Sequence, residues 1–257
     1  MIAVISDIHA NLTAFEAVLA DIDSHDVERI ISLGDVVGYG PDPVACLNIV
    51  RERVGTSICG NHDVAALNQA FGFNKYAKMA IDWTRDLIRP KWYSGHEAAE
   101  RWSFLENLPD RHREGGVLFV HASPRDPITE YIEESDTVDM GFGPSDKIVQ
   151  IIDMIEKLCF VGHTHKAGII TDDYRYLRIR DLPEQTFELK EGHKALCNIG
   201  SVGQPRDGDP RASYVLWDGD SRMTYRRVDY DIQKTIDKMR AVEALHERLG
   251  QRLLTGT

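Results

Sequence analysis

The sequence lacks paired cysteines, runs of basic residues and long hydrophobic segments. Its four cysteines form no Cys-x-x-Cys pair, which is typical of reduced thiols in a cytoplasmic protein: Cys46, Cys59, Cys159 and Cys197. The formal net charge is -11 and no Lys/Arg run could neutralise a phosphate backbone, so we expect no strong nucleic-acid binding. Because no apolar stretch reaches bilayer length and Met1 leads directly into an apolar run, we expect neither membrane association nor a secretion signal.

The length of 257 residues, 42% of them hydrophobic, is enough to bury one core, so we expect a single domain over residues 1–257. The first sixty residues read as repeated βα units, which predict parallel strands. Beyond residue 165, short apolar runs alternate with turns such as Asp218-Gly219, which predicts antiparallel hairpins and a second sheet. We therefore expect an α/β sandwich of two sheets with helices on the outside.

Two further helical segments are predicted. Residues of about 64–114 have helical periodicity, and the stripe that contains Trp83 and Trp102 is better explained by core packing than by a substrate pocket. Residues of about 230–254 carry apolar side chains at spacings of three and four, which predicts one C-terminal helix. Its apolar stripe could pack on the body of the protein or pair with a second copy in a homo-oligomer.

The strongest signal lies where the predicted strands end. The run from Ile2 to Ile5 has the composition of a strand buried on both faces, and Asp7 and His9 follow it. Four later apolar runs end in the same way, and their polar residues are Asp35, Asn61, His121, and His163 with His165. Open α/β sheets bind ligands outside the carboxyl ends of their strands, so these side chains are expected to converge.

The chemistry of these seven side chains favours metal binding. Carboxylate, imidazole and amide groups without thiolates suit manganese, iron, zinc or nickel. Seven ligands are too many for one ion, whereas two ions that share a carboxylate would use them all. A pair about 3.5–4 Å apart can hold both the attacking and the leaving oxygen of a phosphoryl group. Any one of these residues alone would more often be a turn or capping residue, but together they indicate a site.

The ordered blocks Asp7-x-His9, Gly34-Asp35, Gly60-Asn61-His62-Asp63, His121 and Gly162-His163-x-His165 resemble those of the calcineurin-like metallophosphoesterase superfamily. The resemblance covers nearly the whole chain and is greatest to the compact bacterial and archaeal phosphodiesterase-like branch. It implies one metal at Asp7, His9 and His165, a second at Asn61, His121 and His163, and Asp35 as the bridge. It also implies that His62 faces the scissile phosphate and assists the leaving oxygen, with Asp63 orienting the imidazole of His62.

The resemblance implies a phosphoric ester hydrolase that uses two divalent ions, manganese above all, and attacks a small phosphate ester with hydroxide held at the metals. Related protein phosphatases carry an arginine where this sequence has Tyr39, which favours a phosphodiesterase over a phosphomonoesterase or protein phosphatase. Arg206 is then the candidate to grip the substrate phosphate, although its glycine-rich segment could serve only a tight strand exit. A dinucleoside polyphosphate hydrolase remains an alternative. A non-catalytic protein-interaction scaffold of the same fold is a less favoured alternative, because such a scaffold lacks the catalytic histidine that His62 supplies here.

Overall fold

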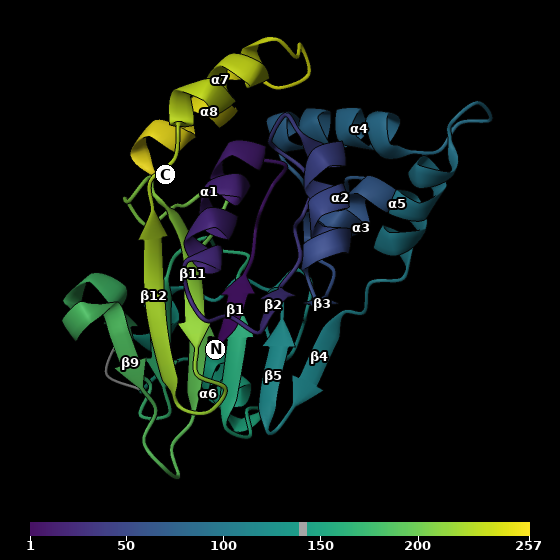
Figure 1. Ribbon diagram of the computed structural model, residues 1–257. Coiled ribbons are helices and arrows are strands. Elements are labelled where there is room, and N and C mark those ends of the chain that lie inside the picture. The colour runs from purple at the N-terminus through teal and green to yellow at the C-terminus, as the bar shows by residue number, and fades with distance from the viewer. Residues whose placement is uncertain (139–142) are drawn as a thin grey trace.

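A computed structural model describes residues 1–138 and 143–257 and contains two six-stranded sheets (Figure 1). Sheet A has the order β3 (Thr56–Ser57), β2 (Arg29–Ser32), β1 (Ile2–Ile5), β11 (Ala212–Trp217), β12 (Arg222–Val228) and β9 (Thr186–Glu188). Sheet B has the order β4 (Arg111–Glu114), β5 (Val117–Val120), β6 (Leu158–Val161), β10 (Ala195–Asn198), β7 (Gly168–Thr171) and β8 (Tyr176–Arg178).

In each sheet three adjacent strands are parallel and the remaining strands pair antiparallel, on one side of the three in sheet A and on both sides in sheet B. β1, β2 and β3 are parallel, as are β5, β6 and β10, whereas β11 runs antiparallel to β1 and β7 runs antiparallel to β10. Five of these six parallel strands are the ones that the short apolar runs predicted, whereas β10 belongs to the part of the chain that was expected to form antiparallel hairpins. The later hairpins complete both sheets rather than forming a second sheet of their own, because the chain crosses between the two sheets after β8, after β9 and again after β10.

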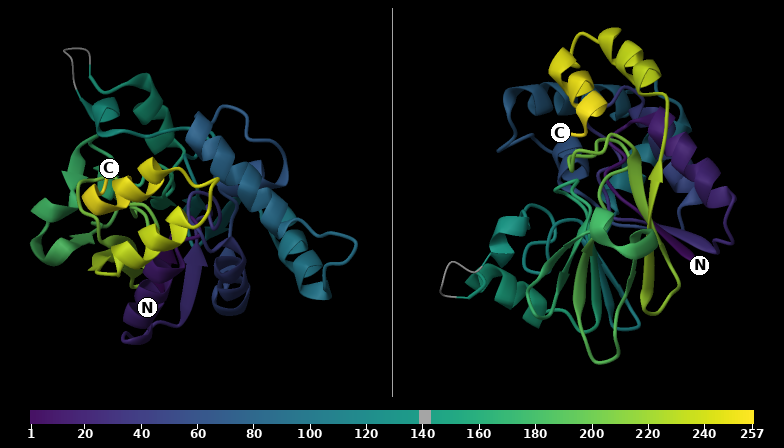
Figure 2. Two further views of the ribbon diagram at one scale, coloured as in Figure 1. Left: turned by 90° about the horizontal axis from the view of Figure 1, so that it is seen from above. Right: turned by 90° about the vertical axis from the view of Figure 1, so that its left-hand side faces the viewer.

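Helices cover the outer faces of the two sheets, and Figure 2 shows α1 and α6 on opposite sides of them. α1 (Leu12–Asp23) and α2 (Pro43–Arg53) bury Phe15, Val18 and Leu47 against sheet A, and α6 (Asp146–Asp153) buries Ile148 and Ile152 against sheet B. A third apolar cluster fills the space between the sheets. The predicted α/β sandwich of two sheets is therefore confirmed.

The segment predicted as helical at 64–114 is mostly so. It contains most of α3 (Asn61–Leu67), then α4 (Lys75–Ile88) and α5 (His96–Glu106). Trp83 packs against the cluster that includes the C-terminal helices, and Trp102 packs against the sheet A cluster, which agrees with core packing. The last four residues form β4 instead, an edge strand whose sequence of charged side chains carries no apolar pattern. Short 3-10 turns also occur: η1 (Glu134–Thr137), η2 (Ile179–Asp181) and η3 (Pro183–Gln185).

The single predicted C-terminal helix is wrong, because two helices, α7 (Ile232–Arg240) and α8 (Glu247–Thr255), occupy this region. His246 caps the N-terminus of the second helix, because its ring Nδ1 accepts a hydrogen bond from the Arg248 backbone N–H at 3.2 Å. The apolar side chains of the two helices are buried with Tyr39 and residues of α4. Packing on the body is thus confirmed, and pairing with a second copy stays a prediction. Among the described residues, no helix has the length and apolar character needed to cross a membrane.

Candidate metal centre

The seven predicted ligands lie together at one end of the two sheets. Asp7 and His9 follow β1, Asp35 follows β2, and Asn61 begins α3 just after β3. His121 follows β5 in sheet B, and His163 and His165 follow β6. Because β1 to β3 are parallel to one another, as are β5 and β6, the carboxyl ends of both groups of strands deliver their side chains to one site.

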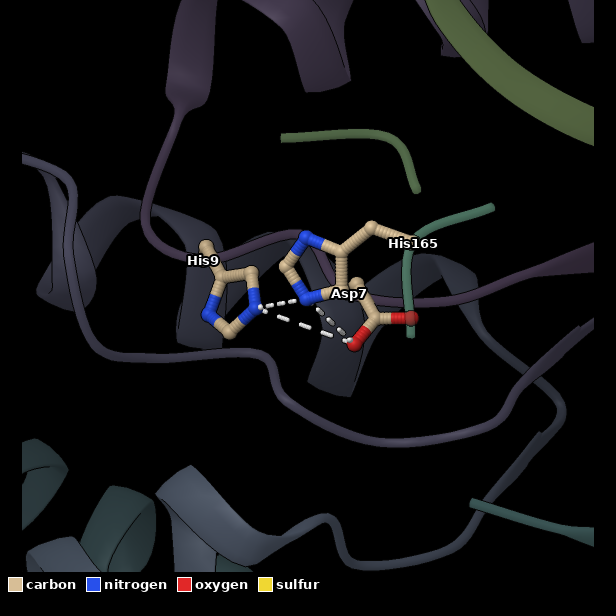
Figure 3. A group of neighbouring side chains, drawn as sticks. All are labelled: Asp7, His9 and His165. Carbon is tan, nitrogen blue, oxygen red and sulfur yellow. Dashed lines mark hydrogen bonds and ion pairs between the residues drawn. The ribbon is translucent and has the colours of Figure 1, made fainter. Parts of the chain in front are cut away.

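Asp7, His9 and His165 form a buried cluster, the Asp7 triad (Figure 3). The Nε2 atoms of His9 and His165 are 3.0 Å apart. Asp7 Oδ1 lies 3.7 Å from His9 Nε2 and 3.3 Å from His165 Nε2, and this buried oxygen accepts no hydrogen bond within the described residues. The triad thus points one oxygen and two nitrogens at a common space.

Asn61, His121 and His163 form a second cluster, the Asn61 triad. Asn61 Oδ1 lies 3.0 Å from both His121 Nε2 and His163 Nδ1, and the two nitrogens are 3.2 Å apart. Asp35 lies between the triads, because its Oδ2 is 3.6 Å from His9 Nε2 and 3.4 Å from His121 Nε2. The structure therefore brings all seven predicted ligands together, with Asp35 in the central position.

Backbone carbonyls fix the ring orientation of all four histidines. The outer ring nitrogens of His9, His165, His121 and His163 contact the carbonyl oxygens of Val37, Gln204, Leu33 and Thr129, respectively. A carbonyl oxygen only accepts, so each outer nitrogen carries the proton and each inner nitrogen presents a lone pair. The inner nitrogens of His9 and His165 then direct lone pairs at each other, and so do the inner nitrogens of His121 and His163. A cation between them resolves this repulsion, so the donor set fits divalent metal ions.

The charges of the site also favour cations. Burial would raise the pKa of the Asp7 carboxyl, but His165 and His121 outweigh it and lower that pKa. The pKa of Asp35 is lowered in the same way, chiefly by His121 and His62. Burial opposes the protonation of His121, yet the Asp35 charge raises its pKa to about 9. Two buried carboxylates thus draw positive charge to the inner nitrogen of His121, and a metal ion bound to its lone pair would supply that charge in place of a proton.

Most of the ligands adopt strained backbone conformations. Positive φ angles occur at Asp7 (53°), His9 (49°), Asp35 (53°), His163 (63°) and His165 (61°). Such conformations cost about 1–3 kcal/mol each in a non-glycine residue and persist where the surroundings enforce them. Gly60 shows how tightly they are enforced, since a Cβ there would lie 2.0 Å from Asp35 Oδ1.

His62 lies beside the triads and is held by packing rather than by hydrogen bonds. Its ring is 4.7 Å from His9 and 4.3 Å from Tyr39, measured between centroids, and its buried Nδ1 has no hydrogen-bond partner among the described residues. Gly38 leaves room for this ring, because a Cβ there would lie 2.2 Å from Nδ1. Burial lowers the pKa of His62 to about 4, so the imidazole is neutral at pH 7.

The prediction that Asp63 orients the His62 ring is wrong. The Asp63 carboxylate instead accepts hydrogen bonds from the backbone N–H groups of Asp35, Val36, Val37 and Gly60, at 2.7–3.3 Å. Burial and the charge of Asp35 raise the pKa of Asp63 to about 7. Asp63 therefore fixes the loop that carries Asp35, and it acts on His62 only through the shared turn.

A cavity of about 100 Å³ opens onto Asp35, Asn61, His62, His163 and His165. Its wall contains aromatic residues that the sequence did not single out for this purpose: Phe73, 4.9 Å from the His62 ring, and Tyr131, 4.2 Å from the His163 ring. Trp83 and Trp102 do not line it. The signal for Tyr131 and Phe73 was absent, because both lie in loops without periodicity.

Arg206 lines the same cavity, where the sequence predicted it. Its guanidinium donates to Gln204 Oε1 at 2.6 and 3.2 Å and lies 5.6 Å from the centroid of the Tyr39 ring. A second cation, Arg252 of α8, was missed. Burial lowers the pKa of Arg252, and the charge of Arg206 lowers it further. The charge of Arg206 thus acts on Arg252, which does not itself line the cavity.

The segment that precedes Arg206 supports the site. Asn198 Nδ2 donates to Gly162 O and to Thr164 Oγ1, both at 2.8 Å, which holds the turn that carries His163 and His165. Ser201 Oγ donates to the Asp7 backbone oxygen at 2.9 Å. Both interpretations of this segment therefore have structural support: it forms a tight strand exit and it brings Arg206 to the cavity.

Comparisons with known proteins agree with this geometry. The model of a family described as the calcineurin-like phosphoesterase superfamily domain matches residues 1–222. An uncharacterized protein of Methanocaldococcus jannaschii is 39% identical, over 100% of this chain and 98% of the relative. The crystal structure of a metallophosphoesterase from Sphaerobacter thermophilus is similar with a TM-score of 0.82 and 38% identity, over 100% and 98% of the two chains. A hypothetical protein of Pyrococcus horikoshii, 17% identical with a TM-score of 0.75 over 100% and 99% of the chains, shares the fold.

Proposed function

The chain belongs to the calcineurin-like phosphoesterase superfamily, and we propose that it is a phosphodiesterase that depends on two divalent metal ions. The observation that carries this proposal is the arrangement of the two triads around Asp35, with the inner lone pairs of four histidines directed at two neighbouring spaces. We propose manganese as the ion that supports activity and the cytoplasm as the compartment, in keeping with a thiolate-free donor set and four free, buried cysteines.

The two triads, Asp35, His62 and Arg206 each have a defined role in this proposal. The Asp7 triad would hold one ion, the Asn61 triad the other, and Asp35 would bridge them. A bound pair of divalent ions would polarise the phosphoryl oxygens and supply a nucleophile from water. His62, neutral and next to the cavity, would donate an N–H hydrogen bond to the leaving oxygen. Arg206 would position a non-bridging oxygen of the phosphate.

The preference for diesters rests on the lining of the cavity. Arg206 is the one lysine or arginine in the described lining, whereas Tyr39, Phe73 and Tyr131 offer aromatic surface. A phosphomonoester dianion would need more positive charge than a diester monoanion. The aromatic side chains suit an organic group attached to the phosphate.

The test compares p-nitrophenyl phosphate with an aryl phosphodiester that has the same leaving group, with manganese and after chelation. We expect a higher kcat/KM for the diester, no hydrolysis after chelation, and recovery when manganese is added. Arg206→Ala should reduce hydrolysis of the monoester more than that of the diester. Arg240→Ala is the matched control, since Arg240 is exposed and lies on α7 outside the cavity.

A preference for the monoester across metals and pH would restore a phosphomonoesterase or protein phosphatase as the better proposal. Full activity in protein shown by elemental analysis to be free of metal would overturn the two-metal proposal. Failure to hydrolyse any phosphate ester with any divalent ion, despite stoichiometric metal, would favour the non-catalytic scaffold.

A further inference from the structure

A second and larger cavity adjoins the metal centre. It has a volume of about 780 Å³, and Arg206 lines both this cavity and the one over the metal ligands. It lies where β8, the last strand of sheet B, faces β12 of sheet A. The outer strand β9 pairs with β12 only at Arg222, Met223 and Thr224, so the later part of β12 is left open to this cavity.

The lining of this cavity, which we call the basic groove, has an excess of positive charge. Six cationic side chains line it, against three carboxylates: Lys166, Arg178, Arg180, Arg206, Arg211 and Arg227, with Glu134, Asp207 and Asp209. Lys166 and Arg180 have carboxylate neighbours that do not line the cavity, Glu133 and Asp181, so the excess of positive charge belongs to the lining itself, in a chain whose net charge is -11. A concave surface of one sign concentrates ligands of the opposite charge.

The cations of the groove fall into two groups. Arg227 is buried in an ion pair with Asp207, and Arg211 donates to Asp209 at 2.7 Å, so both maintain the loop at 206–211. The second group contains Lys166, Arg178 and Arg180; Arg178 donates to Glu134 through Nε and Nη2, so the Nη1 donors are not used in that ion pair.

Lys166 and Arg178 are each about half exposed, with side-chain exposures of 45% and 49%. Lys166 Nζ donates to Glu133 at 2.7 Å and, within the described residues, to no other group, which leaves two of its three N–H donors. Arg180 is 72% exposed, and its Nε lies 3.9 Å from Asp181 Oδ1, which is too far for a hydrogen bond. These side chains can donate to a ligand while they keep their present partners.

The groove and the metal centre share two short stretches of backbone. Lys166 directly follows the ligand His165, and Arg206 lies two residues after Gln204, whose carbonyl oxygen holds the His165 ring. Because Arg206 borders both cavities, a molecule whose phosphate lies at the metal ligands beside Arg206 has the groove as its neighbour.

We propose that the basic groove binds a second anionic group of the substrate, such as a phosphate, attached to the alcohol part of the phosphodiester. This inference rests on the proposed function in one respect, that the scissile phosphate lies at the metal centre. Binding of the distant anion by Lys166, Arg178 and Arg180 would hold the scissile phosphate against the metals and raise kcat/KM. It narrows the substrate class to diesters that carry a further negative charge.

The test uses p-nitrophenyl alkyl phosphodiesters whose alkyl chains, of increasing length, end either in a methyl group or in a phosphonate that cannot be hydrolysed. At low ionic strength we expect kcat/KM to be about tenfold higher for the phosphonate at the chain length that reaches the groove. Lys166→Ala and Arg178→Ala should each reduce this ratio, and the double variant should bring it to about one. Arg175→Ala is the control, because Arg175 is an exposed arginine paired with Asp173 outside the groove.

Several outcomes would overturn the inference. A ratio of about one at every chain length in the wild type would do so, as would a ratio that survives in the double variant or falls equally in Arg175→Ala. If the wild type hydrolyses the methyl-ended diesters with a ratio of one, the proposed function stands and only the groove fails.

If no diester is hydrolysed at all, the proposed function fails, and the groove is tested by calorimetry with an alkyl phosphonate that contains no ester. Binding that is lost in the double variant and kept in Arg175→Ala would support the groove. Equal binding in all variants would exclude it.

Discussion

The two triads of the metal centre differ in charge and in access. The Asp7 triad contains a carboxylate, and His165 alone of its three members lines the cavity over the site. The Asn61 triad consists of neutral ligands, and both Asn61 and His163 line that cavity. One metal is thus expected to be held strongly in a closed position. The other is expected to be held more weakly where substrate arrives.

Asp35 is the side chain that makes the two triads one site. Its Oδ2 is close to a histidine of each triad, and its Oδ1 accepts the His62 backbone N–H at 2.8 Å. The same carboxylate therefore ties both metal positions to the turn that carries His62. Removing its charge should affect both triads, whereas removing the charge of Asp7 should affect only one.

The largest expected effect is that of Asp35→Asn, which keeps the shape of the side chain but removes the bridging charge. We expect it to lose both ions and to fall to the activity of the chelated wild type. Asp7→Asn, the matched control, should lose the ion of its own triad and keep part of the other. Elemental analysis measures the number of ions per chain, and hydrolysis rates measure the remaining activity. An Asp35→Asn variant that retains two ions per chain would contradict the central position of Asp35.

His62→Ala comes next in size and asks whether His62 belongs to the Asp7 triad as a ligand. Its ring lies close enough to His9 and Asp35 for the three to form a possible metal group. If His62 instead acts on the leaving oxygen, the variant should keep both ions while turnover falls by about 10² to 10⁴.

Metal content and kcat for His62→Ala, measured beside the exposed His96→Ala as a control, separate these cases. A loss of one ion per chain in His62→Ala alone would make His62 a ligand. The Asp7 triad would then have His62 as a further ligand, and the comparison of the two triads would change.

The sequence predicted the ligands because their signals are local. Short apolar runs end directly at Asp7, Asp35 and His121, and no long-range information is needed to recognise a strand exit. The parallel order of the first strands then follows from the short crossovers between them. The same reasoning failed at β4, whose charged side chains follow no apolar pattern although β5 pairs with it.

The residues that were missed depend on tertiary contacts. Tyr131 reaches His163 from a loop, and Arg252 reaches the neighbourhood of Arg206 only because α7 and α8 are separate helices. The apolar side chains at residues of about 230–254 keep a helical spacing throughout, so they do not reveal the break between α7 and α8. The part played by Asp63 was also beyond the sequence, because its neighbour His62 is near in the chain while its hydrogen-bond partners belong to the Asp35 loop.

The smallest expected effect comes from making the two triads more alike in charge. Asn61→Asp places a carboxylate in the neutral triad, with its oxygen where Asn61 Oδ1 now meets His121 and His163 at 3.0 Å. The position is also the first residue of α3, where negative charge is favourable.

In the wild type we expect a chelator to remove the ions in two steps, the ion of the Asn61 triad first, because that triad lacks a charge of its own. In Asn61→Asp the first step should require about tenfold more chelator, a change of about 1.4 kcal/mol in binding free energy, and it should approach the second step. Turnover should fall modestly, since added negative charge at the metals weakens their attraction for phosphate. Asn68→Asp adds the same charge at the exposed end of α3 and should leave both steps in place. Two unchanged steps in Asn61→Asp would show that charge does not set the order of metal release, and access through the cavity would then be the remaining difference between the triads.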